Sequence, residues 1–219
     1  MLYNAIFDMD GLMIDSESVF VRGFVQAGKE MGYCDVEKVC KSTIGVNSQK
    51  TREIFLEYYG DDFDYDGLRD LGRKYISAYY AKNGVPIKKG LFLLLEFLKK
   101  QGMKLAVATS TSRDKAMKTL FEDTKIGSYF DAVVCGNMVS KSKPNPEIYL
   151  KAAECIKAEP SSCYVFEDSV NGIKAAYAAG MKPIMIPDLL EPTDEIRPML
   201  YACFSSLEEA LNFIRELYA

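Results

Sequence analysis

From residue 90 onward, short runs of apolar residues alternate with longer stretches whose apolar positions recur at helical spacing. Such runs predict buried strands, and apolar positions at i, i+3 and i+4 predict helices that cover them. We expect strands over 105–108, 132–135, 164–166 and 183–186, and helices over 91–100, 112–123, 146–157, 170–179 and 205–218. This alternation favours a Rossmann-like α/β core, in which a parallel sheet carries helices on both faces.

The pattern before residue 84 is different. An apolar run over 3–7 predicts the first strand, whereas helical patterns over 19–31, 49–59 and 65–80 follow without a buried strand among them. We therefore expect residues 1–15 and 84–219 to form the α/β core domain and residues 16–83 to form a small inserted helical domain. Glycine and proline mark the linkers over 11–16 and 82–89, through which the insert could hinge.

Composition narrows the function classes. The chain has 219 residues, of which 48% are hydrophobic, and carries a net charge of −4. Its acidic balance and scattered lysines argue against a nucleic-acid partner. It has no apolar run long enough to span a bilayer, and residues 1–7 lack the pattern of a signal peptide. We expect a cytoplasmic protein that binds no membrane, with a monomer as the default.

Cysteine and histidine usage excludes several chemistries. The six cysteines are far apart and include no C-x-x-C pair, so we expect reduced, mostly buried thiols. The chain contains no histidine, which excludes Ser-His-Asp triads and H-E-x-x-H zinc sites. A general acid or base must therefore be a carboxylate, lysine, tyrosine or cysteine.

Two aspartates stand where the first predicted strand ends. Asp8 and Asp10 are two residues apart, so their side chains can point to the same side of the strand, and Gly11 lets the backbone turn. Paired carboxylates bind a hard cation such as Mg²⁺, or one of them acts as a nucleophile. A solvated turn is an equally good interpretation of Asp-x-Asp-Gly taken alone, because these are ordinary turn residues.

Polar residues also follow the other strands. Thr109, Ser110 and Thr111 end one strand and suit a phosphate oxygen, although Thr109 could simply cap the next helix. Lys143 comes just before Pro144 and Pro146, which could hold it rigidly, but it could also be an ordinary solvated lysine. Glu167 and Asp168 could be charges at a helix N-terminus. Ligands bind beyond the carboxyl ends of strands in such sheets. Together these residues predict a site that transfers a phosphoryl group.

The same residues carry a family resemblance over the full length of the chain. It rests on four motifs in order: Phe7-Asp8-Met9-Asp10-Gly11 with Ile14-Asp15-Ser16-Glu17, then Ala108-Thr109-Ser110, then Ser142-Lys143-Pro144, then Phe166-Glu167-Asp168-Ser169-Val170-Asn171-Gly172-Ile173. The chain resembles the haloacid dehalogenase superfamily. Within it, the resemblance is to the branch with a helical cap after the first motif, which includes sugar-phosphate phosphatases and β-phosphoglucomutase.

The resemblance implies roles for these residues. Asp8 would be the nucleophile that forms an aspartyl phosphate, and Asp10 would be the acid/base. Thr109 and the Ser110 amide would hold a phosphoryl oxygen, and Lys143 would neutralise its charge. Mg²⁺ would be bound by Asp8, the Asp10 carbonyl and Asp168, with Glu167 in or next to the first shell. In the cap, Gly45, Val46 and Asn47 would contact the substrate, and closure of the cap would exclude water.

The expected function is Mg²⁺-dependent hydrolysis of a small phosphate monoester, such as a sugar phosphate. A β-phosphoglucomutase-type mutase is the alternative, but those mutases have a cap histidine where this chain has Phe20, and basic residues where it has Ile44 and Ser48. Basic residues elsewhere in the cap could partly replace them: Arg22, Arg52, Arg73 and Lys74. A receiver-type phospho-acceptor module is a remote alternative, because such modules lack a cap and a later acidic pair.

Overall fold

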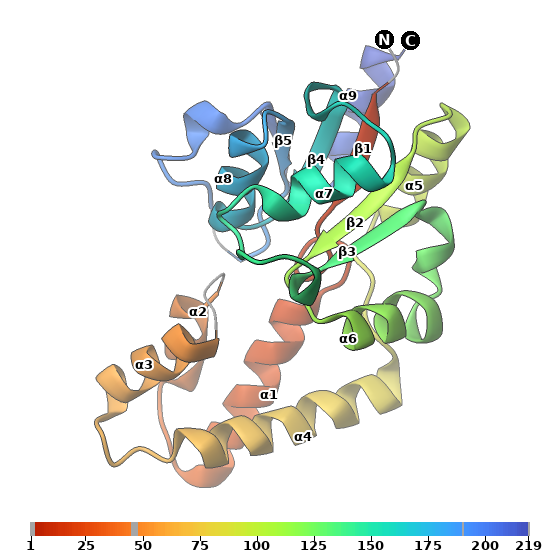
Figure 1. The fold of residues 1–219 in the computed structure, drawn as a ribbon. Coiled ribbons are helices and arrows are strands. Elements are labelled where there is room, and N and C mark those ends of the chain that lie inside the picture. The colour runs from red at the N-terminus through yellow and green to blue at the C-terminus, as the bar shows by residue number, and fades with distance from the viewer. Residues whose placement is uncertain (1–2, 45–47, 190, 219) are drawn as a thin grey trace. The chain divides into compact units, whose positions relative to one another are not determined.

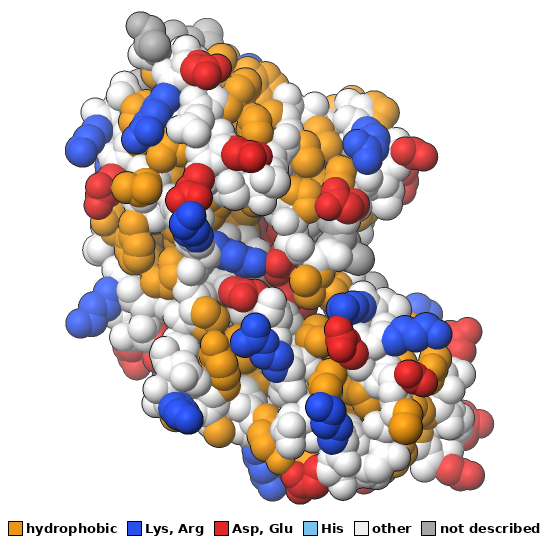
Figure 2. Space-filling view, turned by 180° about the vertical axis from the view of Figure 1, so that it is seen from behind, with side chains coloured by type: hydrophobic (Ala, Val, Ile, Leu, Met, Phe, Trp, Pro, Cys, Tyr) orange, Lys and Arg blue, Asp and Glu red, His pale blue; other side chains and the backbone are white. Residues whose placement is uncertain are grey.

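The computed structural model describes residues 3–44, 48–189 and 191–218. The chain divides into two compact units, one formed by residues 1–14 and 87–219 and the other by residues 15–86. No helix in the described ranges is both long enough and apolar enough to cross a membrane. Figure 2 shows acidic and basic side chains interspersed over one face of the protein.

The described residues of the first unit form a parallel six-stranded sheet with the strand order β3-β2-β1-β4-β5-β6 (Figure 1). This confirms the predicted Rossmann-like α/β fold. The strands are β1 (Asn4–Phe7), β2 (Leu105–Thr109), β3 (Ala132–Cys135), β4 (Cys163–Glu167), β5 (Lys182–Met185) and β6 (Ala202–Cys203). Because the chain passes from β1 to β2 on one side and later to β4 on the other, β1 lies at the switch point where such folds bind ligands.

Helices connect these strands. They are α5 (Leu91–Lys100), α6 (Arg113–Met117), α7 (Glu147–Cys155), α8 (Val170–Ala178) and α9 (Leu207–Leu217), with the short helices η2 (Ile126–Tyr129), η3 (Gly136–Met138), η4 (Pro160–Ser162) and η5 (Arg197–Met199). Ser206 caps α9, because its side chain accepts a hydrogen bond from the Glu209 amide at 3.2 Å. The helix predicted over 112–123 is α6 followed by a π-helix, η1 (Lys118–Asp123).

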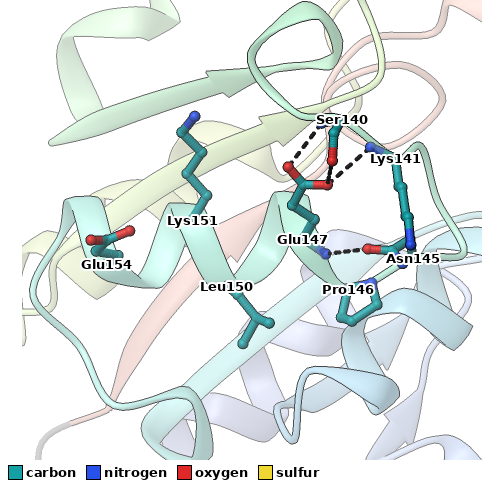
Figure 3. A pocket seen from close by; sticks show the side chains of 8 residues that line it. All are labelled: Ser140, Lys141, Asn145, Pro146, Glu147, Leu150, Lys151 and Glu154. Atoms are coloured by element: carbon teal, nitrogen blue, oxygen red, sulfur yellow. Dashed lines mark hydrogen bonds between the residues drawn. The ribbon is translucent and has the colours of Figure 1, made fainter.

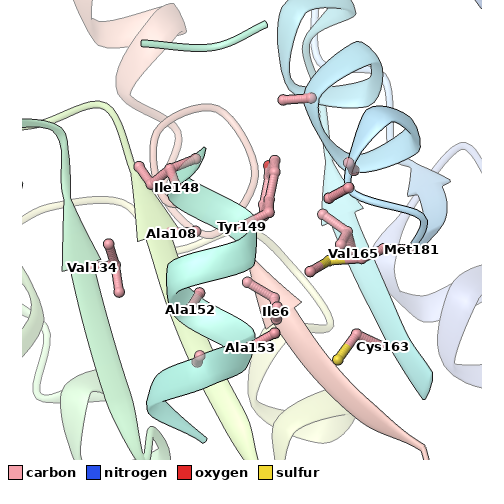
Figure 4. Packing of buried hydrophobic residues seen from close by; sticks show 14 of the residues in the cluster. Ile6, Ala108, Val134, Ile148, Tyr149, Ala152, Ala153, Cys163, Val165 and Met181 are labelled. Carbon is pink, nitrogen blue, oxygen red and sulfur yellow. The ribbon is translucent and has the colours of Figure 1, made fainter. Parts of the chain in front are cut away.

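Small side chains bring α7 and α8 close to one face of the sheet (Figure 4). Ile6 and Val165 point from β1 and β4 toward alanines of these helices, among them Ala152 and Ala153. The next residues along these strands, Phe7 and Phe166, face the other side and stack with ring centroids 4.6 Å apart. Helices α5 and α9, which pack on each other, cover that side (Figure 1). Burial on both faces explains why the strands are mostly apolar.

The second unit is helical: α1 (Ser16–Met31), α2 (Val36–Ser42), α3 (Ser48–Tyr59) and α4 (Tyr65–Asn83). Its own core contains Phe24, Phe55 and Leu68. Glycines let α1 and α4 approach closely, since a Cβ atom at Gly72 would lie 2.8 Å from the Phe24 ring. The short α2 has no counterpart among the predicted helices, because its few residues hold too little periodicity to recognise.

Candidate active site

Three neighbouring strands end at one place on the sheet edge. Asp8 directly follows β1, Thr109 is the last residue of β2, and Glu167 is the last residue of β4. β1 pairs with both of the other strands, and the Asp8 amide donates to the Phe166 carbonyl at 3.0 Å. The parallel register therefore brings these side chains together, as carboxyl ends of adjacent parallel strands must.

Lys143 is the cation at the centre of this cluster. Its ammonium donates to Asp8 Oδ1 at 2.5 Å, to Glu167 Oε1 at 2.7 Å and to the Ala108 carbonyl at 3.1 Å. All three hydrogens of the ammonium therefore have acceptors. The Tyr149 ring lies 4.8 Å from Nζ, within cation–π range. The Lys143 side chain is only 6% exposed, so these contacts operate with little screening by water.

The loop that carries Lys143 is fixed to the start of α7. The Glu147 carboxylate accepts from the Ser140 amide, the Ser140 hydroxyl and the Lys141 amide at 2.7 to 2.9 Å, as Figure 3 shows. The Glu147 amide in turn donates to Asn145 Oδ1 at 3.1 Å. These hydrogen bonds involve residues before and after Lys143, so they hold the backbone of the loop from which the lysine side chain extends.

Glu167 is fully buried and hydrogen-bonded through both oxygens. Oε1 accepts from Lys143 and from the Tyr149 hydroxyl at 2.9 Å. Oε2 accepts from the amides of Asp168 and Ser169, both at 2.8 Å, and from the Ser169 hydroxyl at 3.0 Å. The first turn of α8 packs directly on this carboxylate, because a Cβ atom at Gly172 would lie 1.7 Å from Oε1. Glu167 is therefore fixed in place, and its carboxylate holds the Lys143 ammonium.

Asp10 is half-buried, and hydroxyl groups at the end of β2 and just after it hold its side chain. Asp10 Oδ2 accepts from the Thr111 hydroxyl at 2.7 Å and, at a longer 3.4 Å, from the Thr109 hydroxyl. The Thr111 amide donates to Thr109 Oγ1 at 3.0 Å, so the two threonines are linked to each other. Ser110 between them is exposed.

Asp168 is buried against the loop that follows β1. Gly11 has φ +82°, a conformation that favours glycine, and a Cβ atom there would lie 2.2 Å from Asp168 Oδ2. Any other residue at position 11 would both strain the backbone and collide with this carboxylate. The Asp168 side chain thus lies beside the turn that carries Asp8 and Asp10.

Burial and crowding shift the pKa values of this cluster. Burial raises the pKa of Asp8 to about 7, because repulsion by Glu167 and Asp10 adds to desolvation and Lys143 offsets only part of it. Burial, Glu167 and Asp8 raise the pKa of Asp168 well above its usual range. Burial alone would lower the pKa of Lys143, but Asp8 and Glu167 raise it, so the lysine stays charged. One cation thus faces three buried carboxylates.

This charge imbalance fits a divalent cation. Asp8 and Asp168 are oxygen donors of the kind that Mg²⁺ prefers, and both carry an energetic cost as buried anions that a cation would remove. Within the described ranges, however, no three acidic or cysteine side chains come close enough to form a complete metal site by themselves. A cation here would therefore need further ligands, such as backbone carbonyls, water or the substrate phosphate.

The structure brings most of the residues predicted from the sequence into one place. Asp8, Lys143 and Glu167 are in direct contact, and Asp10 contacts Thr109. Gly45, Val46 and Asn47 lie outside the described residues, so their role in substrate binding stays a prediction, as do the catalytic and metal-binding roles of the others.

Neither the role of Tyr149 nor the contact of Thr111 with Asp10 was predictable from the sequence pattern. Tyr149 lies on the buried face of α7 beside Ile148 and Ala152. In the sequence it cannot be distinguished from the other apolar residues of that face. Its hydroxyl is the available signal, because a buried hydroxyl requires a hydrogen-bond partner. Burial and Glu167 raise the pKa of Tyr149 well above its usual range, so the hydroxyl remains a donor.

Comparison with known proteins places the chain in a family of hydrolases. The family model of the haloacid dehalogenase-like hydrolases matches residues 5–186. The chain belongs to this family, which confirms the resemblance carried by the four motifs.

Individual relatives agree with this assignment. The chain is 29% identical to a phosphorylated carbohydrates phosphatase of Thermotoga maritima, over 97% of this chain and 98% of that protein. It is 28% identical to hexitol phosphatase B of Escherichia coli, over 84% and 82%. Among solved structures, a Thermotoga maritima protein provisionally described as a β-phosphoglucomutase superposes with a TM-score of 0.80 at 28% identity, over 98% and 99% of the two chains.

Proposed function

We propose that this protein is a Mg²⁺-dependent phosphatase that hydrolyses a small phosphate monoester of the sugar-phosphate class through an aspartyl phosphate on Asp8. The observation that carries the proposal is the buried contact of Asp8 with Lys143, with Asp10 held two residues away. Relatives named as phosphatases of phosphorylated carbohydrates and of hexitols support the substrate class.

In the first step, the Asp8 carboxylate attacks phosphorus, and the bond from phosphorus to the leaving oxygen breaks. That oxygen takes a proton from Asp10 and departs as the alcohol, which leaves Asp8 phosphorylated. In the second step, water attacks the phosphorus and gives its proton to Asp10. The bond to Asp8 breaks, and inorganic phosphate is released.

The other residues bind and neutralise the phosphoryl group. Lys143 is held so that its charge lies beside the attacking carboxylate, and the Thr109 hydroxyl with the Ser110 amide would bind a phosphoryl oxygen. Asp8, Asp168 and the backbone carbonyl of Asp10 would hold Mg²⁺. When bound, the ion would neutralise the carboxylates and the phosphoryl oxygens, and favour the ionised form of Asp8.

Glu167 has a different role in this proposal. Both of its oxygens already accept hydrogen bonds from protein donors, so we assign it to orienting Lys143 rather than to the ion. We also assign the helical unit of residues 15–86 as the cap that excludes water.

A phosphatase is favoured over a mutase by the residue at position 20. The mutases that this chain resembles use a cap histidine there, whereas Phe20 packs on Phe24 with ring centroids 4.3 Å apart. A phenyl ring can neither donate nor accept a proton. We therefore expect the phosphoenzyme to be hydrolysed rather than to return its phosphoryl group to a sugar.

The proposal is tested with a panel of phosphorylated sugars and other small monoesters, assayed for phosphate release with Mg²⁺. β-Glucose 1-phosphate is also tested for isomerisation to glucose 6-phosphate. Asp8→Asn should abolish release, because an amide keeps the shape but cannot attack phosphorus. Asp114→Asn, at an exposed position of the same unit, is the matched control and should retain wild-type turnover. Near-wild-type turnover of Asp8→Asn would exclude the aspartyl-phosphate mechanism.

A further inference from the structure

The Asp10 carboxylate is held by a residue that the sequence pattern assigns only to phosphate binding. Thr109, Ser110 and Thr111 form a short hydroxyl-rich run at the end of β2, and such a run predicts contacts to a phosphate oxygen. The Thr111 hydroxyl instead donates to Asp10 Oδ2 at 2.7 Å, a short distance for a bond between a hydroxyl and a carboxylate. Its partner is therefore the proposed acid/base.

The backbone fixes Thr111 where this bond is formed. Its amide donates to Thr109 Oγ1 at 3.0 Å, and Thr109 is the last residue of β2, which pairs with β1. Thr111 is thus tied to β2, which lies beside β1, the strand that the Asp10 loop follows. The Thr109 hydroxyl lies 3.4 Å from the same Oδ2, too long to replace the Thr111 bond.

A carboxylate held in this way differs from one that rotates. The terminal torsion of an aspartate is broad, so an unrestrained Asp10 would present its oxygens in many directions. A hydroxyl that donates to Oδ2 favours one orientation of the carboxylate and occupies that oxygen, so Oδ1 is the oxygen that can contact a substrate or a water molecule. Proton transfer requires the donor oxygen within hydrogen-bond reach of the leaving group.

We propose that Thr111 is a positioning residue, which orients Asp10 so that Oδ1 delivers the proton to the leaving oxygen and later receives one from water. This inference rests on the proposed phosphatase function. The reaction is unchanged, and Thr111 itself neither gains nor loses a proton in it. Thr111 acts through Asp10 alone, which separates this role from binding of the phosphoryl group.

The test compares two substitutions at this position. Thr111→Val keeps the branched shape but removes the hydroxyl, and Thr111→Ser keeps the hydroxyl but removes the methyl group. Loss of a hydrogen bond to a charged group should lower kcat by roughly 10- to 100-fold, with KM changed by less than about threefold. Thr111→Ser should retain kcat within about threefold of wild type. A Thr111→Val enzyme with wild-type kcat, or a change confined to KM, would overturn the inference.

A double-mutant cycle with Asp10→Asn shows whether Thr111 acts through Asp10. Once the acid/base is removed, Thr111→Val should lower the residual kcat by less than about twofold, because the group that it orients is already inactive. If the double variant instead loses kcat by the full product of the two single losses, Thr111 acts on the phosphoryl group or on the fold, and the inference is wrong. Circular dichroism checks the fold, and Thr111→Ala repeats the comparison with a smaller side chain.

The same experiment distinguishes this inference from the proposed function. If wild-type protein releases phosphate from none of the monoesters, the phosphatase proposal fails, and Thr111 loses its role with it. If wild type is active and Asp10→Asn is not, but Thr111→Val turns over like wild type, only the inference about Thr111 is wrong.

Discussion

Replacing Lys143 with methionine should destabilise the protein more than replacing any exposed lysine that forms an ion pair of similar length. Methionine keeps an unbranched chain of similar size but removes the ammonium that bonds to Asp8, Glu167 and the Ala108 carbonyl. The two carboxylates would then remain buried without their counterion, since their side chains are only 10% and 1% exposed.

The expected loss of unfolding free energy follows from the burial of the ion pair rather than from the distance between its charged atoms. Removing one partner of a buried ion pair typically costs about 3–5 kcal/mol, because the remaining charge is left uncompensated. This is a large fraction of the roughly 5–15 kcal/mol by which domains are stable. Lys118 provides the matched control: its bond to Asp123 is 2.6 Å long, but the two side chains are 60% and 28% exposed. Such exposed pairs contribute about 0–1 kcal/mol.

The measurement is urea unfolding followed by circular dichroism, with a chelator present so that no divalent cation replaces the lost charge. Lys143→Met should lower the free energy of unfolding by about 3–5 kcal/mol and Lys118→Met by at most about 1 kcal/mol. Adding Glu167→Gln to Lys143→Met should recover about 1 kcal/mol or more, because it removes one of the unpaired charges. Equal losses of unfolding free energy in Lys143→Met and Lys118→Met would refute the reasoning that burial determines how much an ion pair contributes.

Two further predictions concern the same cluster. Tyr149→Phe removes the hydroxyl that donates to Glu167 but keeps the ring beside Lys143, so it should lower the free energy of unfolding by about 1.5–3 kcal/mol in urea. Tyr177→Phe, at a 54% exposed position, should change it by less than about 0.5 kcal/mol, and equal effects would show that the buried hydroxyl adds nothing. Excess chelator should abolish phosphate release and Mg²⁺ should restore it, because the buried carboxylates would repel a phosphate without a cation. Full activity in the chelator would exclude the metal from the mechanism.

Several elements were predictable from the sequence because one physical cause dominates each of them. The helix over 91–100 and the strand over 132–135 have the predicted bounds in the structure. The apolar residues of the helix recur at helical spacing, and the strand is a short continuous apolar run, as a strand in a sheet covered on both faces requires. Asp8 and Glu167 were recognisable as strand-end acids for the same reason, since a parallel sheet places strand ends along one edge.

Other elements gave too weak a local signal. The strand β6 (Ala202–Cys203) and the helix α2 (Val36–Ser42) are too short to show a period, and packing against their neighbours stabilises them. The π-helix η1 carries the residues of an ordinary helix, because the sequence pattern does not distinguish one helical spacing from a slightly wider one.

The sequence by itself determined which groups are candidates for the chemistry: two aspartates, a lysine and a later acidic pair, in a chain without histidine. Only the tertiary structure decided how these groups are joined. Asp8 and Lys143 are 135 positions apart, and no local pattern indicates that one ammonium serves Asp8 and Glu167 together or that Thr111 restrains Asp10. These contacts exist because folding removes the groups from water, where each buried charge and hydroxyl must find a partner within the protein.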